Sequence, residues 1–341
     1  MSKQRLVIVG NGMAAARVVE ELLQRGGAKS FQIVIFGEEP CPSYDRMQLA
    51  DVMSGARRVE DILHLTPGWY EEHRITVHWG ERAVLVSRQA RTVYGSAGSV
   101  ERYDKLVFAT GSSPHFPPIK NLFNAEGQRL AGVCDFRTLA DCVQIVGLSS
   151  GARAVSIIGG GLLGLEAARG LAPHACRVDL VHRGARLLRP GEDEEVAYQA
   201  QRRLEGMGVR VRLNRGVEAL VGRERVTGLL LDDGTELPSD LVVIATGLIP
   251  NTWLAFQCGL GVERGIAVDA QQRAIGDRRI YALGECAQSL GKVYGLSGAI
   301  RQQAKSIAEH LTRGEPSSAL ASTAVRERQA RQHAHPGGEA R

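Results

Sequence analysis

The chain has 341 residues, of which 44% are hydrophobic and 23% charged, a composition typical of an ordinary globular protein long enough for two domains. Its net charge of +5 is spread along the sequence and only 5% of its residues are aromatic, which argues against a nucleic-acid-binding protein. Since no apolar run reaches the roughly 20 residues of a membrane span and no leader precedes the first apolar segment, we expect a cytoplasmic protein without membrane contact.

The first predicted unit is a strand, a glycine-rich turn, a helix and a second strand. The strand covers residues 5–9, and the first glycine turn covers Gly10 to Ala15. The helix is predicted from Met13 to about Arg25, and the second strand over residues 31–36. Both strands are continuous apolar runs, which is typical of a parallel sheet covered on both faces, so the segment predicts a βαβ unit.

The spacing of small residues in the first glycine turn is suited to a dinucleotide. Gly10 permits a tight bend, Gly12 lets the backbone approach a pyrophosphate, and Ala15 lets the helix pack closely on the strand. The helix N-terminus adds free N–H groups and partial positive charge. The predicted contacts are Gly10, Gly12, Met13, Ala14 and Ala15.

Two acidic residues follow the second strand of this unit. Glu38 lies where a carboxylate can accept hydrogen bonds from both hydroxyls of an unphosphorylated ribose. Glu39 is a rival for the same role, and an acid in a surface turn is the alternative for either residue. We therefore expect a ribose contact at the end of this strand.

A second βαβ unit repeats the architecture in the middle of the chain. Its strand covers residues 154–158, its helix residues 163–171 and its next strand residues 176–181. The second glycine turn, Gly159 to Gly164, joins the first strand to the helix and predicts a second dinucleotide. The predicted contacts are Gly159, Gly161, Leu162, Leu163 and Gly164.

The second unit lacks an acid at the end of its second strand. His182 and Arg183 stand there instead, with Arg186 close behind. A cationic pair can accept a 2′-phosphate through charge-assisted hydrogen bonds, which favours NADPH or the use of both NADH and NADPH. A solvated basic turn is the alternative.

The remaining elements predict that the second unit is inserted into the first. Similar strands over residues 106–111 and 241–247 are each followed by proline, and the last strand and helix are expected at 280–283 and Ser297 to Leu311. The fold class is therefore α/β with two Rossmann-like dinucleotide-binding domains. The predicted boundaries are 1–120 and 246–312 for the first domain, 121–245 for the inserted domain, and 313–341 for a disordered tail.

Gly284 and Glu285 follow the last predicted strand and precede the last helix. A carboxylate at Glu285 can bind polyol hydroxyls, and a structural cap is the alternative. The helix that begins near Ser297 directs its N-terminal amides toward whatever lies above the sheet. These residues extend the first candidate site.

Taken together, these motifs resemble the FAD- and NAD(P)H-dependent reductases of the pyridine nucleotide-disulfide oxidoreductase type. Besides the two glycine turns, the resemblance rests on Ala109 to Gly111, Ala245 to Asn251 and Ile280 to Glu285, and it covers roughly residues 3 to 312. Shorter segments look most like the flavin module of the large subunit of assimilatory NAD(P)H nitrite reductase, with rubredoxin and ferredoxin reductases next. Those segments are 36–40, 44–46, 284–287 and 291–296.

The resemblance implies a role for each candidate residue. FAD would lie over the first glycine turn with its adenosine ribose on Glu38, its ribitol on Glu285 and Arg46 near the pyrophosphate or flavin. NADH or NADPH would lie over the second turn with Glu166 near the nicotinamide. The alternatives are a surface ion pair for Arg46 and a first-turn helix acid for Glu166. Further implied cofactor contacts are Thr110, Gly111, Gly247, Gly284 and Ser297.

Several departures from the family pattern limit what is carried over. Asp51 stands where ferredoxin-reductase relatives commonly place a lysine beside the flavin, so no flavin-contacting lysine is expected. The six cysteines include no C-x-x-C pair, and Cys41 is displaced from the position near Met47 where some relatives carry a redox cysteine. The C-terminal interface domain of the relatives is expected to be absent. No metal, iron–sulfur or sirohaem site is expected on this chain.

These observations predict an FAD-dependent NAD(P)H oxidoreductase that takes hydride from NAD(P)H and releases electrons singly. The acceptor would be a separate iron–sulfur or haem protein, since no disulfide is available, and nitrite or nitrate assimilation is the expected setting. One alternative is an NAD(P)H:ferredoxin or rubredoxin reductase. Another is a flavin-binding regulatory or assembly protein with little turnover.

Overall fold

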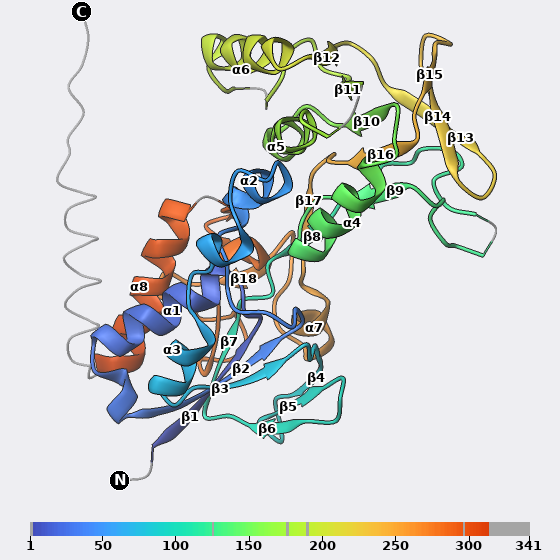
Figure 1. The fold of residues 1–341 in the computed structure, drawn as a ribbon. Helices are drawn as coiled ribbons and strands as arrows, with labels where there is room; N and C mark the ends of the chain where they lie inside the picture. The colour runs from blue at the N-terminus through green and yellow to red at the C-terminus, as the bar shows by residue number, and fades with distance from the viewer. Residues whose placement is uncertain (1–2, 125, 175–176, 189–190, 296, 314–341) are drawn as a thin grey trace, which may run out of the picture.

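The chain forms two parallel sheets in two halves of the molecule, seen in the computed structural model in Figure 1. The structure describes residues 3–124, 126–174, 177–188, 191–295 and 297–313. The tail predicted over 313–341 lies outside these residues, except that Arg313 ends the last helix. Both sheets have the strand order and helical connections of a Rossmann-like unit, which confirms the predicted fold class.

The first sheet has the order β19-β7-β1-β2-β3, and every neighbouring pair is parallel. Helices α1 and α8 pack together on one face, and a small antiparallel sheet, β4 to β6, covers the other. The bounds are β1 Gln4–Val9, α1 Met13–Gln24, β2 Phe31–Gly37, β3 Thr76–Trp79, β4 Ala83–Ser87, β5 Thr92–Gly95, β6 Val100–Arg102, β7 Lys105–Phe108, β19 Ile280–Ala282 and α8 Ser297–Arg313.

The second sheet repeats this layering with the order β12-β11-β10-β16-β9, again parallel throughout. Helices α4 and α5 share one core with the sheet, and the antiparallel sheet β13 to β15 covers the other face. The bounds are β9 Val133–Asp135, α4 Leu139–Ser149, β10 Val155–Ile158, α5 Leu162–Leu171, β11 Val178–Val181, α6 Glu194–Gly206, β12 Val209–Arg212, β13 Val217–Gly222, β14 Val226–Leu231, β15 Glu236–Pro238 and β16 Leu241–Ile244.

The two passages of the chain between the halves run side by side. Strand β8, Ser112–Pro114, pairs antiparallel with β17, Leu248–Pro250. Next to this pair, the Thr110 hydroxyl donates to the Asn251 carbonyl (2.7 Å) and the Asn251 side-chain amide donates to the Thr110 carbonyl (2.9 Å). The outgoing and returning segments are therefore fixed to each other at the point where both leave a sheet.

Helix α2, Leu49–Met53, lies between the halves (Figure 1) and packs on α5. Ala50 and Met53 belong to the same hydrophobic core as Ala167 and Leu171 of α5. Gly170 favours the close approach, because a side-chain carbon there would lie 3.0 Å from the Ala50 carbonyl oxygen and would displace the end of the Met53 side chain. A segment of the first half thus completes the core of the second.

The remaining elements are short. They are η1 Gly27–Lys29, η2 Arg46–Gln48, η3 Val59–Ile62, α3 Pro67–Glu72, α7 Trp253–Gln257, β18 Ile266–Val268, η4 Gly284–Cys286, β20 Ala287–Ser289 and β21 Lys292–Val293. Within the described part of the chain, no helix has the length and apolar character needed to span a membrane.

Candidate functional site

The first glycine turn has the geometry of a phosphate cradle. Gly10 has a φ of +106°, and a side-chain carbon there would collide with the carbonyl oxygen of Ala109, just after β7. Gly12 is the N-cap of α1, no side chain caps the helix, and its first turn holds no acid. A side-chain carbon at Gly12 would meet nothing within 4 Å. The first-turn N–H groups therefore face open space, which fits a dinucleotide pyrophosphate.

The second glycine turn repeats this geometry. Gly159 has a φ of +115°, and a side-chain carbon there would collide with the carbonyl oxygen of Ala245, just after β16. Gly161 is the N-cap of α5, and a side-chain carbon there would meet nothing within 4 Å. Gly164 lies against the Gly159 carbonyl with no room for a side-chain carbon. Leu162 begins α5 and is exposed, and Leu163 packs partly against the core. This turn also fits a pyrophosphate.

The structure distinguishes the two rival acids at the end of β2. Glu39 accepts hydrogen bonds from the Tyr44 hydroxyl and from Arg46 Nη2, both at 2.6 Å. Glu38 is exposed, and no hydrogen bond or ion pair joins it to another described residue. Glu38 is therefore the carboxylate available for a ribose, and Glu39 instead positions Arg46.

Arg46 is part of a hydrogen-bonded network and not a solitary surface charge. Besides Glu39, it contacts the backbone carbonyl of Arg137 through Nη1 at 2.9 Å. Arg137 lies between β9 and α4 and in turn forms an ion pair with Glu285. The two arginines thus bring together the loop after β2, the start of the second half, and the loop after β19.

Glu285 is held in place by two partners. The Ser112 hydroxyl donates to Glu285 Oε2 at 2.7 Å, and Arg137 Nη2 donates both to this carboxylate and to the Ser112 oxygen. Burial lowers the pKa of Arg137, and the charge of Glu285 opposes that shift. Arg137 was not predicted from the sequence. Its neighbours Thr138 and Asp141 form a capping box, a pattern that indicates the start of a helix and gives no sign of a ligand contact.

The other residues predicted to contact the first nucleotide differ in where they lie relative to the first glycine turn. A side-chain carbon added at Gly284 would lie 3.1 Å from Ala14 Cβ. The loop after β19 therefore reaches the first glycine turn. Met13 begins α1, and Ala15 is fully buried in the first turn of that helix. Ser297 begins α8 as predicted, but its side chain lies outside the described residues.

Thr110, Gly111 and Gly247 lie at the crossing between the halves. Gly111 accepts a backbone hydrogen bond from Asn251 at 2.9 Å, and Gly247 accepts one from His115 at 2.9 Å. Gly111 and Gly247 both have positive φ angles, +64° and +130°, which turn the chain sharply after each strand. Their observed role is to fix the two crossing segments.

Glu166 lies in α5 at the seam with α2. Its pKa is raised to about 7, mainly by burial and also by the charges of Asp45 and Asp51, while the charge of Arg169 opposes the shift. Arg169 also forms an ion pair with Asp51 across the seam. The carboxyl of Glu166 therefore titrates near neutral pH, in a cluster that also contains Asp51 and Arg169.

His182 is built into the second glycine turn. Its Nδ1 accepts a hydrogen bond from the Gly160 amide at 3.1 Å, and burial together with the charge of Arg183 lowers its pKa. It is therefore an uncharged acceptor at neutral pH. Arg183 is exposed, which leaves it as the cation of the predicted pair.

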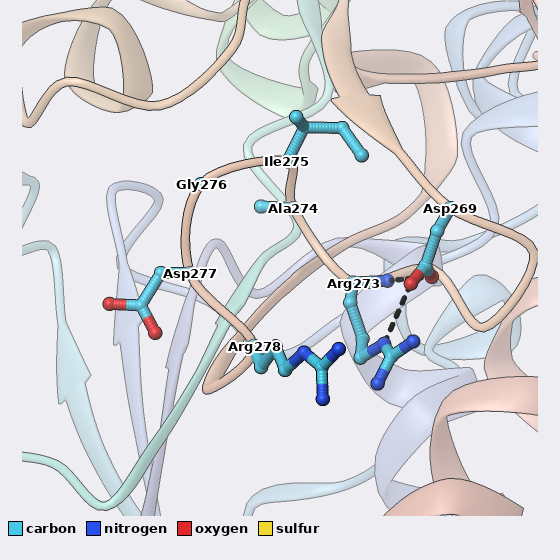
Figure 2. Close-up of a pocket in the computed structure, with 7 residues that line it drawn as sticks. All are labelled: Asp269, Arg273, Ala274, Ile275, Gly276, Asp277 and Arg278. Carbon is cyan, nitrogen blue, oxygen red and sulfur yellow. Dashed lines mark hydrogen bonds and ion pairs between the residues drawn. The ribbon is translucent and has the colours of Figure 1, made fainter.

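A hollow in the loop between β18 and β19 is unrelated to these turns. It is lined by Asp269, Arg273, Ala274, Ile275, Gly276, Asp277 and Arg278 (Figure 2). Asp269 and Arg273 form an ion pair at 2.7 Å within the loop. Since the loop enters the amino end of β19, it lies at the edge of the sheet opposite the first glycine turn, which follows the carboxyl end of β1.

The described cysteines are all free thiols, and Cys176 lies outside the described residues. Burial and the charge of Glu39 raise the pKa of Cys41, which lies in a loop and is a protonated thiol at neutral pH. No group of three or more potential metal ligands occurs among the described residues.

Comparison with known proteins identifies the family. A family model described as "Pyridine nucleotide-disulphide oxidoreductase" matches residues 4–326. The chain belongs to this family. The match confirms the resemblance inferred from the motifs, and the FAD and NAD(P)H of this family correspond to the two nucleotides predicted from the two glycine turns.

The curated relatives include reductases of nitrogen oxides. The chain is 38% identical over 312 residues to the "Assimilatory nitrate reductase electron transfer subunit" of Bacillus subtilis, covering 91% of this chain and 39% of that protein. It is 37% identical over 318 residues to the "Nitrite reductase (NADH) large subunit" of Escherichia coli, covering 92% and 37%. The chain thus spans less than two fifths of the length of these relatives.

Two further matches cover a larger share of the protein compared with this chain. The "Nitric oxide reductase FlRd-NAD(+) reductase" of Vibrio vulnificus is 33% identical over 289 residues, covering 84% of this chain and 73% of that protein. The solved covalent complex of putidaredoxin reductase with putidaredoxin matches with a TM-score of 0.83 and 28% identity, covering 93% of this chain and 77% of that one.

Proposed function

We propose that this chain is an FAD-dependent NAD(P)H oxidoreductase that delivers electrons to a separate iron–sulfur or haem protein. The observation that carries the proposal is the repetition of one phosphate cradle, at Gly12 and at Gly161, in two halves whose crossing strands are hydrogen-bonded together. Two dinucleotides held in one molecule are what hydride transfer between them requires.

The residues around the two turns divide the work of binding. Around the first turn, Glu38 would take the adenosine ribose of FAD, and Glu285, fixed by Arg137, would take the ribitol hydroxyls. Arg46 would neutralise pyrophosphate charge from its place beside Glu39. The second turn would hold the NAD(P)H pyrophosphate at the start of α5, with Glu166 one turn further along the same helix. Thr110, Gly111, Gly247, Gly284 and Ser297 would complete the contacts.

When bound, FAD supplies the hydride acceptor and the ability to release electrons one at a time. The protein's own contribution is positioning, because hydride transfer depends on the distance and stacking of two rings. Burial keeps part of the Glu166 population protonated near neutral pH, which reduces negative charge at the seam between α2 and α5. No acid–base residue has to act on the rings themselves.

Nitrite or nitrate assimilation is the setting we propose, with an iron–sulfur or sirohaem reductase as the acceptor. Its support is the similarity to the Bacillus subtilis electron transfer subunit and the nitrite reductase large subunits. We also propose that the protein works in the cytoplasm, which the five free thiols among the described cysteines support.

The second candidate function is reduction of a small electron-carrier protein. It is favoured because the Vibrio vulnificus and putidaredoxin reductase matches each cover more than two thirds of the compared chain. In that case the acceptor would be a small rubredoxin- or ferredoxin-type protein. The two candidates share both nucleotide sites and differ only in the acceptor, so an acceptor assay distinguishes them.

The test is an anaerobic titration of the flavin-loaded protein with NADH and with NADPH, followed by addition of acceptors. We expect one equivalent of reduced nicotinamide to bleach the flavin absorption, and a nitrite-reducing iron–sulfur partner to restore it. Rapid reoxidation by a small ferredoxin with no stimulation of nitrite reduction would favour the second candidate. A flavin that is not bleached would reject both and favour a regulatory or assembly role.

A further inference from the structure

The two halves of the chain place opposite charges at one equivalent position. The Gly10 amide donates to the Phe36 carbonyl at 2.9 Å, and the Gly159 amide donates to the Val181 carbonyl at 2.9 Å. These matching hydrogen bonds align the strand ends residue by residue. Two residues after each carbonyl, the first half has Glu38 and the second has Arg183. Arg183 therefore replaces the ribose-binding carboxylate of the first half.

The segment that carries Arg183 is attached directly to the second glycine turn. We define the basic loop as His182 to Leu188. At its start, His182 Nδ1 accepts from the Gly160 amide at 3.1 Å, and at its end the Leu188 amide donates to the Gly160 carbonyl at 2.8 Å. Leu187 is buried beneath the same glycine. Both ends of the loop are thus fixed against the turn, which keeps Arg183 beside it.

Several carboxylates of this half already have other partners. Asp179 is fully buried and paired with Arg177 (3.0 Å) and Arg212 (2.7 Å). Glu194 is paired with Arg186, and Asp233 is paired with Arg215. Asp193 accepts from the Glu195 amide as the N-cap of α6.

Arg183, in contrast, has no hydrogen-bond or ion-pair partner among the described residues. It is exposed at the carboxyl edge of the sheet. Its five N–H donors are available for an anion, and no unpaired carboxylate is available for ribose hydroxyls at this position.

We propose that Arg183 makes the second site selective for a dinucleotide with a 2′-phosphate, so that NADPH is preferred over NADH. The inference rests on the proposed function, because it assumes that the second turn holds a nicotinamide dinucleotide. The guanidinium forms charge-assisted hydrogen bonds with the phosphate, whereas the adenosine ribose of NADH offers only two hydroxyl groups that a carboxylate would bind better. Arg186 adds positive charge to the same loop but remains shared with Glu194.

The test is calorimetric titration of the FAD-saturated protein with NADP⁺ and with NAD⁺. We expect NADP⁺ to bind about 10- to 100-fold more tightly, the range of a hydrogen bond to a charged group. Arg183→Ala should weaken NADP⁺ binding by that factor and leave NAD⁺ unchanged, and Arg183→Glu, which copies Glu38, should reverse the preference. Arg202→Ala is the matched control, since it removes an exposed arginine from α6 in the same half; it should change neither affinity.

Equal affinity for the two dinucleotides, or equal weakening of both by Arg183→Ala, would overturn the specificity and leave the proposed function intact. Failure of both to bind the unmodified protein would overturn the proposed function and the specificity together. Raising the salt concentration provides a second readout, because NADP⁺ affinity should fall more steeply than NAD⁺ affinity when a phosphate charge is involved.

Discussion

Two alanine substitutions in the second glycine turn should separate folding from nucleotide binding. Gly159→Ala and Gly161→Ala add the same methyl group two residues apart. At Gly159 the φ of +115° is unfavourable for alanine and the new carbon meets the Ala245 carbonyl. At Gly161 the φ is −78° and nothing lies within 4 Å. The first change therefore strains the folded protein, and the second does not.

The magnitudes follow from these two environments. Backbone strain at Gly159 costs about 1–3 kcal/mol and forced overpacking about 1–3 kcal/mol, so the variant should lose about 2–6 kcal/mol of folding free energy. At Gly161, alanine is a poorer N-cap than glycine, but it also lowers the entropy of the unfolded chain by about 0.4–1 kcal/mol. These effects oppose each other, so its stability should stay within about 1 kcal/mol of the parent.

The assay pairs urea unfolding with titration of NADP⁺ into the FAD-saturated protein. Gly161→Ala should unfold at nearly the parent urea concentration but bind NADP⁺ at least about tenfold more weakly, because its methyl group occupies the space at the start of α5. Full binding by a stable Gly161→Ala protein, or a Gly159→Ala protein as stable as the parent, would refute the reasoning. A bulky residue at Gly12 should abolish flavin retention, whereas one at Gly161 should leave a yellow protein that NAD(P)H cannot reduce.

Three further predictions concern the charges at the seam and the first site. Because the pKa of Glu166 is raised from 4.5 to about 7 on folding, its ionisation destabilises the folded state as pH rises from 4.5 to about 7. Glu166→Gln should therefore be more stable than the parent by about 1–2 kcal/mol at pH 8, and nearly equal to it at pH 4, in urea unfolding. Arg169→Ala should shift that pH dependence to higher pH, because the charge of Arg169 lowers the pKa of Glu166. It should also lower the folding free energy by about 0.5–1 kcal/mol at pH 7 through loss of the ion pair with Asp51. An unchanged pH profile would contradict the coupling between Arg169 and Glu166. Arg137→Met should cost about 1–3 kcal/mol in urea unfolding because it leaves Glu285 without its cation, and Arg137→Lys should recover part of the loss.

Local sequence patterns predicted the two βαβ units because their signals are short-range. The predicted helix starts, Met13 and Ser297, are the observed ones, and the predicted strand over 31–36 is observed as Phe31–Gly37. In these segments the apolar runs and small residues reflect burial within one unit. The choice between Glu38 and Glu39 was left open, since it depends on Tyr44 and Arg46 reaching back across a loop.

The contacts between the halves could not be predicted in this way. Arg137 and Glu285 are separated by 148 positions, and no periodicity relates them. The packing of α2 on α5 is similarly favoured by Gly170, which looks like an ordinary helix glycine in the sequence. Such contacts depend on how distant segments meet in three dimensions, which local sequence patterns do not encode.

The surroundings of the two glycine turns explain why identical cradles can hold their nucleotides differently. Segments far apart in the chain converge on the first turn: Gly284 lies against Ala14, and the Tyr70 hydroxyl donates to Asn11 at 3.0 Å. The second turn is flanked mainly by the adjacent basic loop. The first turn is therefore supported by several distant elements, and the second by the loop next to it. We infer that the first site retains its nucleotide through many turnovers and the second exchanges it in each one, as a reductase with resident FAD and diffusing NADPH requires.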